Sequence, residues 1–495
     1  MTDVLLATAA APSLAEAIDA AVRPLADALS GFIFHAVPVG GGDGGPAMFP
    51  LIVGWLIVAA VVSTLYFHFI NVRGFRHGFD LIRGRYAEPG ATGEVSHFRA
   101  LTSAVSGTVG LGNIAGVAVA IGIGGPGATF WMIVAGLLAM SSKFVECTLG
   151  VMYRVEHPDG SVGGGPMYYL RRGIAANFPR LAPLGLGLAV AYALCTMMGA
   201  VGSGAAFQAN QAYAQFAGLG LAKLPNAPLW FGLAYAVLAG AVILGGIGRI
   251  GSVTAKLVPG MAVLYFVGAL FVILVNLPAL PGALQAIIDG AFTAEGVTGG
   301  VVGALIQGFR RAVFSNEAGL GSAAIAHSAV RTREPLSEGF VALWEPFIDT
   351  VVICTMTALV IVITGQHLAG GADGVQLTSA AFATVSPWFP YVLAVVVFLF
   401  AFSTSITWGY YGATACGFLF RESRLAVLVF KLVFLAGTIA GCTLPLGSIV
   451  DLADALLFIM AVPNLIGVYL LMPVVKRALD DYLARLRSGA ISPTR

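Results

Sequence analysis

Long apolar segments separated by short polar loops make up most of the chain. A helix needs about 20 mainly apolar residues to cross a bilayer, and segments of this character recur from residue 50 to residue 475. The pattern predicts an all-α polytopic membrane protein with about 11 transmembrane helices. The expected spans are 50–70, 102–129, 130–153, 184–216, 230–244, 252–277, 301–330, 341–363, 391–419, 425–442 and 453–475.

The residues before the first span differ in character from the rest. Residues 1–13 carry Asp3 and no basic residue, so they do not form the basic start of a signal peptide. Residues 13–37 have the pattern of an amphipathic helix at the membrane surface. We therefore expect an N-terminal amphipathic or extracytoplasmic segment at 1–48, a single membrane transporter domain at 49–475 and a cytoplasmic tail at 476–495.

Composition supports the membrane class and excludes others. Hydrophobic residues are 58% of the 495 residues and charged residues only 10%, whereas soluble globular domains have about 25% charged residues. The net charge of +2 is too small to indicate nucleic-acid binding, and the lipid bilayer is the expected surrounding. All five cysteines fall within apolar segments, so we expect free thiols rather than disulfides or a zinc site. The sequence gives no indication of an oligomeric state.

The basic residues are distributed unevenly between the two sets of loops. Of the 26 Lys and Arg residues, 20 fall in loops on one side of the expected spans and two, Arg23 and Lys223, on the other. The remaining four lie within spans: Lys143, Arg310, Arg311 and Lys431. Cytoplasmic loops are enriched in Lys and Arg. We therefore expect a multi-pass plasma-membrane protein, of the inner membrane in bacteria, with its N-terminus outside and its C-terminus in the cytoplasm.

Two of the expected spans contain helix-breaking residues. The stretch 102–129, TSAVSGTVGLGNIAGVAVAIGIGGPGAT, has eight glycines, and 304–330 combines polar residues with Gly319 and Gly321. Each interior glycine costs a helix about 0.5–1 kcal/mol relative to alanine. Backbone groups freed by a break are tolerated at membrane depth only when they are buried in protein or line a wet cavity, where they can bind an ion or a carboxylate.

The spacing of the two breaks predicts an internal repeat. Counting from the first broken span, the second is the sixth, so the core divides into five helices plus five. A repeat with an odd number of helices is inverted relative to the membrane. We expect core repeats at about 100–277 and 299–475, preceded by one extra N-terminal helix at 50–70.

Five motifs carry a resemblance to a known family. GLGNIAGVA, GGPGATFW, GGGPMYYL, FSNEAGLGSA and FIDTVVICT occur in this order and spacing, and together they resemble the alanine or glycine:cation symporter family, the sodium:alanine symporters. The resemblance covers roughly residues 96–475 and implies a leucine-transporter-like fold. Two departures stand out. Leu111 occupies a position where the family carries Ser or Thr, and Glu345-Pro346 replaces an apolar pair.

The resemblance also implies which residues form the site. Backbone N–H groups around Gly110 to Gly112, at the start of a half-helix, suit a substrate carboxylate. The expected substrate-binding residues are Gly110, Leu111, Gly112, Gln208, Phe314, Ser315, Asn316 and Trp408. The expected Na⁺ ligands, through carbonyls or side-chain oxygens, are Ser106, Thr108, Val109, Asn113, Ser315, Ala401, Thr404 and Ser405.

Each assignment has a structural alternative. The glycines can serve close helix packing, and Asn113 can be an interhelical hydrogen-bonding residue. Thr404 and Ser405 can bond back to their own helix. Gln208 and Asn210 can be polar residues near the outer interface, and Trp408 a packing aromatic.

Carboxylates within apolar spans are functional candidates by default, and Glu317 and Asp349 are such residues. The alternative for both is a structural ion pair with Arg310, Arg311 or Lys143.

The function that follows is secondary active symport. We expect import of a small neutral amino acid, alanine or glycine, with D-alanine and serine as further candidates, coupled to Na⁺. A broader neutral amino-acid or glutamine:cation symporter, with H⁺ in place of Na⁺, is the alternative. An enzyme is not expected, because no nucleophile and base are suitably placed: the side chains of His327 and Ser328 are adjacent and diverge on a helix. The chain has neither a Walker A motif nor a TVGYG filter sequence.

Overall fold

The computed structural model describes residues 14–42, 45–86, 90–157, 160–293, 300–371 and 373–493. The expectation that 1–13 is not a signal peptide lies outside these residues. So do the first residue of the second expected repeat, 299, and the last two of the expected tail, 494 and 495.

The N-terminal segment forms a helix and a hairpin. The helix expected at 13–37 is α1 (Leu14–Ile33), which packs against α23 (Leu446–Phe458). It is followed by the hairpin β1 (Ala36–Gly42) and β2 (Gly45–Pro50), which the hydrophobic pattern does not predict. The first apolar helix is α2 (Leu51–Tyr66), and two short helices complete this region, α3 (Ile70–Arg73) and α4 (Phe75–Ile82).

The first half of the core begins with the interrupted helix: α5 (His97–Thr108), the π-helical turn η1 (Gly112–Gly116) and α6 (Val117–Gly124). The following elements are α7 (Ala128–Met152), β3 (Val155–Glu156), β4 (Val162–Gly163), α8 (Pro166–Tyr168), η2 (Tyr169–Gly173), α9 (Ile174–Asn177), η3 (Pro179–Leu181), α10 (Ala182–Gly199), η4 (Ala200–Phe207), α11 (Gln208–Gly218), η5 (Leu221–Lys223), α12 (Ala227–Ile243), α13 (Gly246–Val275), η6 (Leu277–Ala279) and α14 (Leu280–Phe292).

The second half begins with the other interrupted helix, α15 (Gly300–Asn316) and α16 (Ala323–His327). The following elements are α17 (Pro335–Ala342), α18 (Trp344–Pro346), η7 (Phe347–Cys354), α19 (Thr355–Ile363), η8 (Gln366–Leu368), α20 (Gly374–Ala383), α21 (Phe389–Leu419), α22 (Arg424–Gly441), α23 and α24 (Ala461–Arg487). The last span therefore continues as one helix into the expected tail.

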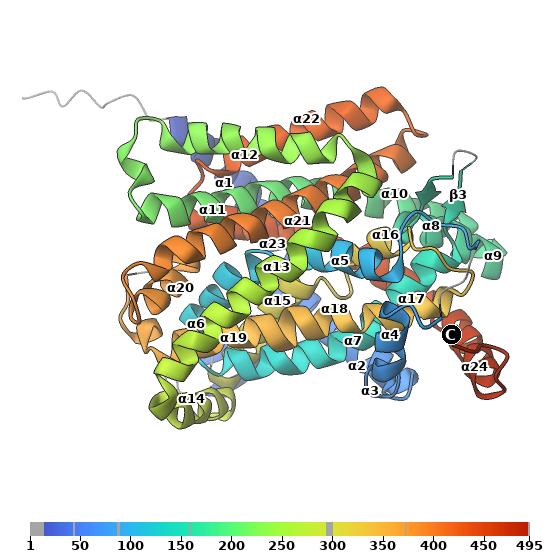
Figure 1. Cartoon of the computed structure of the whole chain (residues 1–495), viewed down its shortest axis with the longest axis horizontal. Helices are drawn as coiled ribbons and strands as arrows, with labels where there is room; N and C mark the ends of the chain where they lie inside the picture. The colour runs from blue at the N-terminus through green and yellow to red at the C-terminus, as the bar shows by residue number, and fades with distance from the viewer. Residues whose placement is uncertain are drawn as a thin grey trace, which may run out of the picture.

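The long helices form one bundle around a continuous apolar core. Figure 1 shows α14 and α20 at one end of the bundle and the C-terminus at the other. Helix α7 packs against α15, α16 and α17, whereas α21 packs against α5, α10, α11, α13 and α22. On the outside, large apolar side chains of α12, α13 and α22 are exposed, including Val237, Phe271 and Leu432. An exposed apolar surface of this kind is typical of a protein embedded in lipid.

The membrane-spanning character of the chain is confirmed. Among the described residues, 7 helices are long and apolar enough to cross a membrane, or up to 8 with the bent pair formed by α5 and η1–α6, whose two parts differ in direction by 51°. Helices α2 and α12 are shorter apolar helices at two further expected spans. The count of 11 and the inverted repeat stay predictions.

Candidate functional site

The bend in the first interrupted helix lies at Val109, Gly110 and Leu111. Helix α5 ends at Thr108, Val109 leaves helical geometry with ψ 86°, and the backbone resumes as π-helix at Gly112. Glycine is required at residue 110 by a close approach, because a Cβ there would lie 2.3 Å from the Thr404 Oγ1 atom. The sequence-based expectation of a broken helix at this stretch agrees with the structure.

Side-chain oxygens meet the backbone N–H groups of this bend. The Gly110 N–H donates to Asn113 Oδ1 at 2.8 Å, and the Leu111 N–H donates to Gln208 Oε1 at 3.0 Å. All four residues are buried within the bundle. Gln208 begins α11, so the third core helix does bring an amide side chain to the bend. These N–H groups face oxygen acceptors, which is the environment that a substrate carboxylate would also supply.

One oxygen cluster lies between α5 and α21. Thr404 Oγ1 donates to Ser106 O at 3.0 Å and lies 3.5 Å from Val109 O. The hydroxyl of Ser106 donates in turn to Ser403 O at 2.8 Å. Thr404 thus bonds across to the interrupted helix and not back to its own helix. The cluster supplies the carbonyl and hydroxyl oxygens that a hard cation binds.

A second oxygen cluster lies on the other side of the bend, around Asp349 in η7. Its carboxylate accepts hydrogen bonds from Asn113 Nδ2 at 2.7 Å, Ser315 Oγ at 2.8 Å and Thr350 Oγ1 at 2.7 Å. Asn113 Nδ2 also donates to Asp349 O at 3.0 Å. The side chain is fully buried, and none of the ion pairs among the described residues includes it. Asp349 is absent from the expected ligand set, although a carboxylate in an apolar span was a signal for it.

The basic residues near the second break pair elsewhere. Arg310 and Arg311 both form ion pairs with Asp454 of α23, and Lys143 pairs with Glu345 at 2.9 Å. The alternative in which these cations neutralise Glu317 or Asp349 through ion pairs is therefore wrong for the described structure.

The second break is held by side chains on both sides. Glu317 has a left-handed φ of 58°, and its carboxylate accepts from Ser322 Oγ and from Trp408 Nε1, the latter at 2.9 Å. Tyr192 OH donates to Leu320 O at 2.9 Å, and Asn464 Nδ2 donates to Gly319 O at 2.9 Å. Backbone carbonyls freed by this break thus have partners.

Bulky side chains stand beside the π-helical segment η4. The rings of Phe207 and Phe314 are 5.1 Å apart, and the close approach of Trp408 leaves no room for a Cβ at Gly204. Phe314 also lies beside Gly112, where a Cβ would be 3.3 Å from its ring. Segments η1, η4 and η7 are all π-helical, and such turns occur frequently at functional sites.

Other expected site residues point elsewhere or have local partners. Ser405 Oγ donates to Gly204 O at 2.8 Å and contacts Tyr235 OH, so its hydroxyl faces away from Ser106. Thr108 Oγ1 bonds back to Ala104 O at 3.4 Å. The amide oxygen of Asn316 accepts from the Ala318 N–H within the second break. Ala401 is fully buried on α21, one turn before Ser405.

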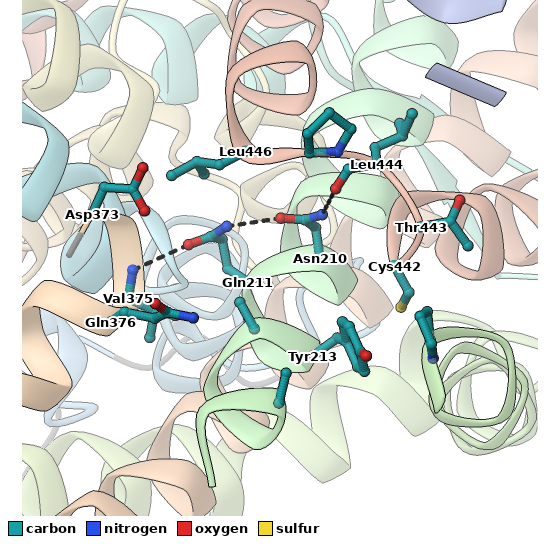
Figure 2. Close-up of a pocket in the computed structure, with 14 residues that line it drawn as sticks. Asn210, Gln211, Tyr213, Asp373, Val375, Gln376, Cys442, Thr443, Leu444 and Leu446 are labelled. Atoms are coloured by element: carbon teal, nitrogen blue, oxygen red, sulfur yellow. Dashed lines mark hydrogen bonds between the residues drawn. The ribbon is translucent and has the colours of Figure 1, made fainter. Parts of the chain in front are cut away.

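Asn210 lies away from the bend, in a separate pocket with a cavity volume of about 490 Å³. Figure 2 shows a hydrogen-bonded row from the Val375 N–H through Gln211 and Asn210 to the Leu444 carbonyl. The row joins α20, α11 and the loop before α23. Asn210 therefore joins α11 to the loop before α23, and of the two amide side chains only Gln208 reaches the bend.

Comparison with known proteins agrees with this geometry. The fold is leucine-transporter-like, since it matches the crystal structure of MhsT in complex with L-phenylalanine with a TM-score of 0.55 at 15% identity, covering 77% of this chain and 90% of that one. Residues 45–494 match the sodium:alanine symporter family. The chain belongs to this family, and it is a membrane transporter of the cation-coupled amino-acid class, not an enzyme.

Two curated relatives cover nearly the whole chain. The sodium/alanine symporter AgcS of Methanococcus maripaludis is 36% identical over 87% of this chain and 93% of its own length. The probable sodium/glutamine symporter GlnT of Bacillus subtilis is 34% identical over 89% of both chains.

Proposed function

We propose that the protein imports a small neutral amino acid together with Na⁺, and that alanine and glycine are its main substrates, with D-alanine and serine as further ones. The observation that carries this proposal is the pair of oxygen clusters on either side of a single bend in a buried helix. One contains Ser106, Val109 and Thr404, and the other contains Asn113, Ser315 and Asp349.

The buried carboxylate of Asp349 favours the binding of a cation on its side of the bend. A buried carboxylate has a desolvation cost of several kcal/mol, and three neutral donors offset this cost only in part. A Na⁺ ion placed among Asp349, Asn113 and Ser315 would neutralise the charge. For this the Asn113 amide would turn its oxygen toward the ion, and the Gly110 N–H would lose its present acceptor.

That release couples the ion to the substrate. With Asn113 turned, the Gly110 N–H is available to a carboxylate, and the Leu111 N–H becomes available when Gln208 moves its oxygen toward an ammonium group. Binding of Na⁺ thus frees the Gly110 N–H for the substrate carboxylate, and binding of the carboxylate frees the Asn113 oxygen for Na⁺. Each ligand raises the affinity of the protein for the other, which is positive cooperativity. An amino acid supplies both charged ends, as the bend requires.

Bulky side chains favour a small substrate. Phe207, Phe314 and Trp408 are all buried near the bend, and Leu111 replaces the smaller polar residue that the family resemblance implies. A substrate side chain larger than a methyl or hydroxymethyl group would have to displace a packed ring.

The orientation follows from charge. The segments rich in Arg between the expected spans, such as 73–85 and 331–333, lie on the same side of these spans as the C-terminus. We propose that this side faces the cytoplasm, as the distribution of Lys and Arg indicates. The bacterial plasma membrane is the proposed location.

A broader neutral amino-acid or glutamine carrier is the second candidate, and a relative bears the name of a probable sodium/glutamine symporter. Coupling to H⁺ in place of Na⁺ belongs to this alternative.

Uptake into proteoliposomes separates the candidates. Labelled alanine, glycine, serine and glutamine are offered under a Na⁺ gradient, an H⁺ gradient or neither, with protein-free liposomes as the control. We expect concentrative uptake of alanine and glycine under the Na⁺ gradient only. Equal uptake of glutamine would support the broader carrier, and uptake driven by the H⁺ gradient alone would contradict Na⁺ coupling.

A further inference from the structure

A second group of buried polar side chains lies between α5, α7, α16, α17 and α18. His97 Nδ1 is 2.5 Å from Glu338 Oε2, and Glu338 Oε1 is 2.6 Å from His327 Nδ1. On the other side of the His327 ring, Nε2 is 3.5 Å from Glu345 Oε2, and Glu345 Oε1 accepts from Lys143 Nζ at 2.9 Å. His97 is 9% exposed, and the other four side chains are fully buried.

The hydrogen-bonding pattern leaves room for one more proton. Both histidines contact Glu338 through Nδ1, so each Nδ1 carries a hydrogen that the carboxylate accepts. His327 Nε2 and Glu345 Oε2 then face each other, and neither has a hydrogen-bond partner among the described residues. Without a proton on Nε2, two lone pairs would oppose each other in a dry interior, which is unfavourable.

The balance of charges within the group also indicates one additional bound proton. With His327 protonated, Lys143 and His327 balance Glu338 and Glu345, and His97 is neutral. With both histidines neutral, the group has one uncompensated negative charge. The other titratable groups around Lys143 and Glu345 are acids, which supply no positive charge: Glu146, Cys147, Glu317 and Tyr411. The cations Arg83 and Arg331 face the group at its His97 end.

A route to the surface leads through His97. This residue lines a pocket with a cavity volume of about 280 Å³, together with Arg83 and Arg331. The pocket belongs to the side of the chain that we propose to be cytoplasmic. When neutral His327 carries its hydrogen on Nε2, its Nδ1 is free, and a proton that reaches His97 can pass through Glu338 to this Nδ1, because each successive pair of atoms is within hydrogen-bond distance.

We propose that His327 and Glu345 bind a proton taken from the cytoplasm by way of His97 and Glu338, and that this proton fastens α16 to α7 and α18. Helix α16 is the second half of the second interrupted helix. Loss of the proton removes the attraction between His327 and Glu345 and so destabilises the packing of α16 next to this break. The rate of transport should therefore fall as the pH on the cytoplasmic side rises. This inference rests on the proposed orientation, but the proton site itself does not depend on which amino acid is carried.

The first test needs no substrate. Thermal unfolding of the purified protein is followed from mildly acidic to mildly alkaline pH. One bound proton changes the unfolding equilibrium constant by at most about tenfold per pH unit, and the fold is most stable where the proton is bound. We expect the Tm of the wild type to fall as pH rises. A Tm that does not fall would overturn the proposal, and that result would leave the proposed function standing.

Glu345→Gln is the informative variant. Its amide can donate to a neutral His327 Nε2, and Lys143 and Glu338 then balance without the extra proton. We expect this variant to fold and to lose the pH dependence of Tm, whereas His367→Gln, a histidine outside the group, keeps it. A Glu345→Gln variant with the wild-type dependence would overturn the proposal. If this variant does not fold, the wild-type measurement still decides.

The second test locates the entrance. In proton-tight proteoliposomes, exchange of a transported amino acid is measured at equal Na⁺ on both sides, with protein inserted in one known orientation. Raising the pH on the side of the C-terminus should slow exchange severalfold, and raising it on the opposite side should not. A response to the opposite side alone would contradict loading through His97.

Discussion

The two interrupted helices differ in what holds their breaks. At the first, the N–H groups of Gly110 and Leu111 bond to neutral amide side chains, which can turn to other partners. At the second, Gly319 and Leu320 carbonyls bond to Asn464 and Tyr192, which are buried on other helices. The first break thus offers exchangeable contacts. The second is fixed while the proposed His327 proton is bound, because Asn464 also bonds to Glu146 and Tyr169.

The second break also contains strain that its contacts offset. Glu317 has a φ of 58°, a left-handed conformation that costs a non-glycine residue about 1–2 kcal/mol. Its carboxylate gains hydrogen bonds from Ser322 and Trp408. Because Trp408 lies on α21 beside η4, the fixed break also holds the largest ring near the bend. The first break therefore provides groups for ligand binding, whereas the second positions the side chains around them.

The largest effect is expected from Asp349→Asn, which removes the buried charge at the first break. Removing one partner of a buried charge pair costs about 3–5 kcal/mol, so the Na⁺ concentration for half-maximal uptake should rise at least about a hundredfold. Sodium titration of uptake measures this. Asp480→Asn, at an exposed residue of α24, is the control and should leave the titration unchanged. Normal Na⁺ dependence in a folded Asp349→Asn protein would remove Asp349 from the site.

A smaller effect, on stability, is expected from Gly321→Ala at the second break. Gly321 has a φ of 78°, and an added Cβ would lie 2.5 Å from Pro166 Cγ. Strain and overpacking together should lower stability by about 2–4 kcal/mol, seen as a lower Tm. Gly122→Ala, where nothing lies within 4 Å of the added Cβ, is the control. If the two variants are equally stable, the second break is not fixed as described.

Trp408→Ala should change selectivity by about 1–3 kcal/mol, the range for one fitted or misfitted group. We expect leucine, valine and glutamine to become competitors and alanine uptake to weaken. Trp408→Phe separates the two roles of the ring, because it keeps most of the volume and loses the bond to Glu317. Equal competition by leucine and alanine against the wild type would show that the pocket is already wide.

The smallest effect is expected from Thr404→Val, which keeps the side-chain shape and removes one neutral oxygen. A net loss of about 1–1.5 kcal/mol corresponds to a rise of about tenfold in the Na⁺ requirement. Thr438→Val is the matched control, since that buried hydroxyl bonds only within α22. An unchanged Na⁺ requirement in Thr404→Val would exclude the cluster on α21.

Composition and spacing predicted the helical membrane fold and the two breaks, because glycines in an apolar span are costly unless the break is used. The resemblance led to Thr404, Ser106 and Val109, which do lie together. The partner of Asn113 was not predictable in the same way. Its contact with Asp349 joins residues 236 positions apart, and no local periodicity shows which buried carboxylate will meet which break.

The hairpin β1–β2 was missed for a related reason. Its residues, including Gly40 to Gly42, have no alternation of apolar and polar side chains, so pairing between the strands rather than local propensity forms it.

Equilibrium binding of radiolabelled sodium to the purified protein tests the role of the first break most directly. Binding is measured with and without alanine, in the wild type and in Asp349→Asn. We expect alanine to increase the affinity of the wild type for sodium, because coupling between two ligands is reciprocal, and we expect Asp349→Asn to lose this increase together with one class of sites. Sodium binding that is the same in both proteins and indifferent to alanine would contradict a cation site at the bend.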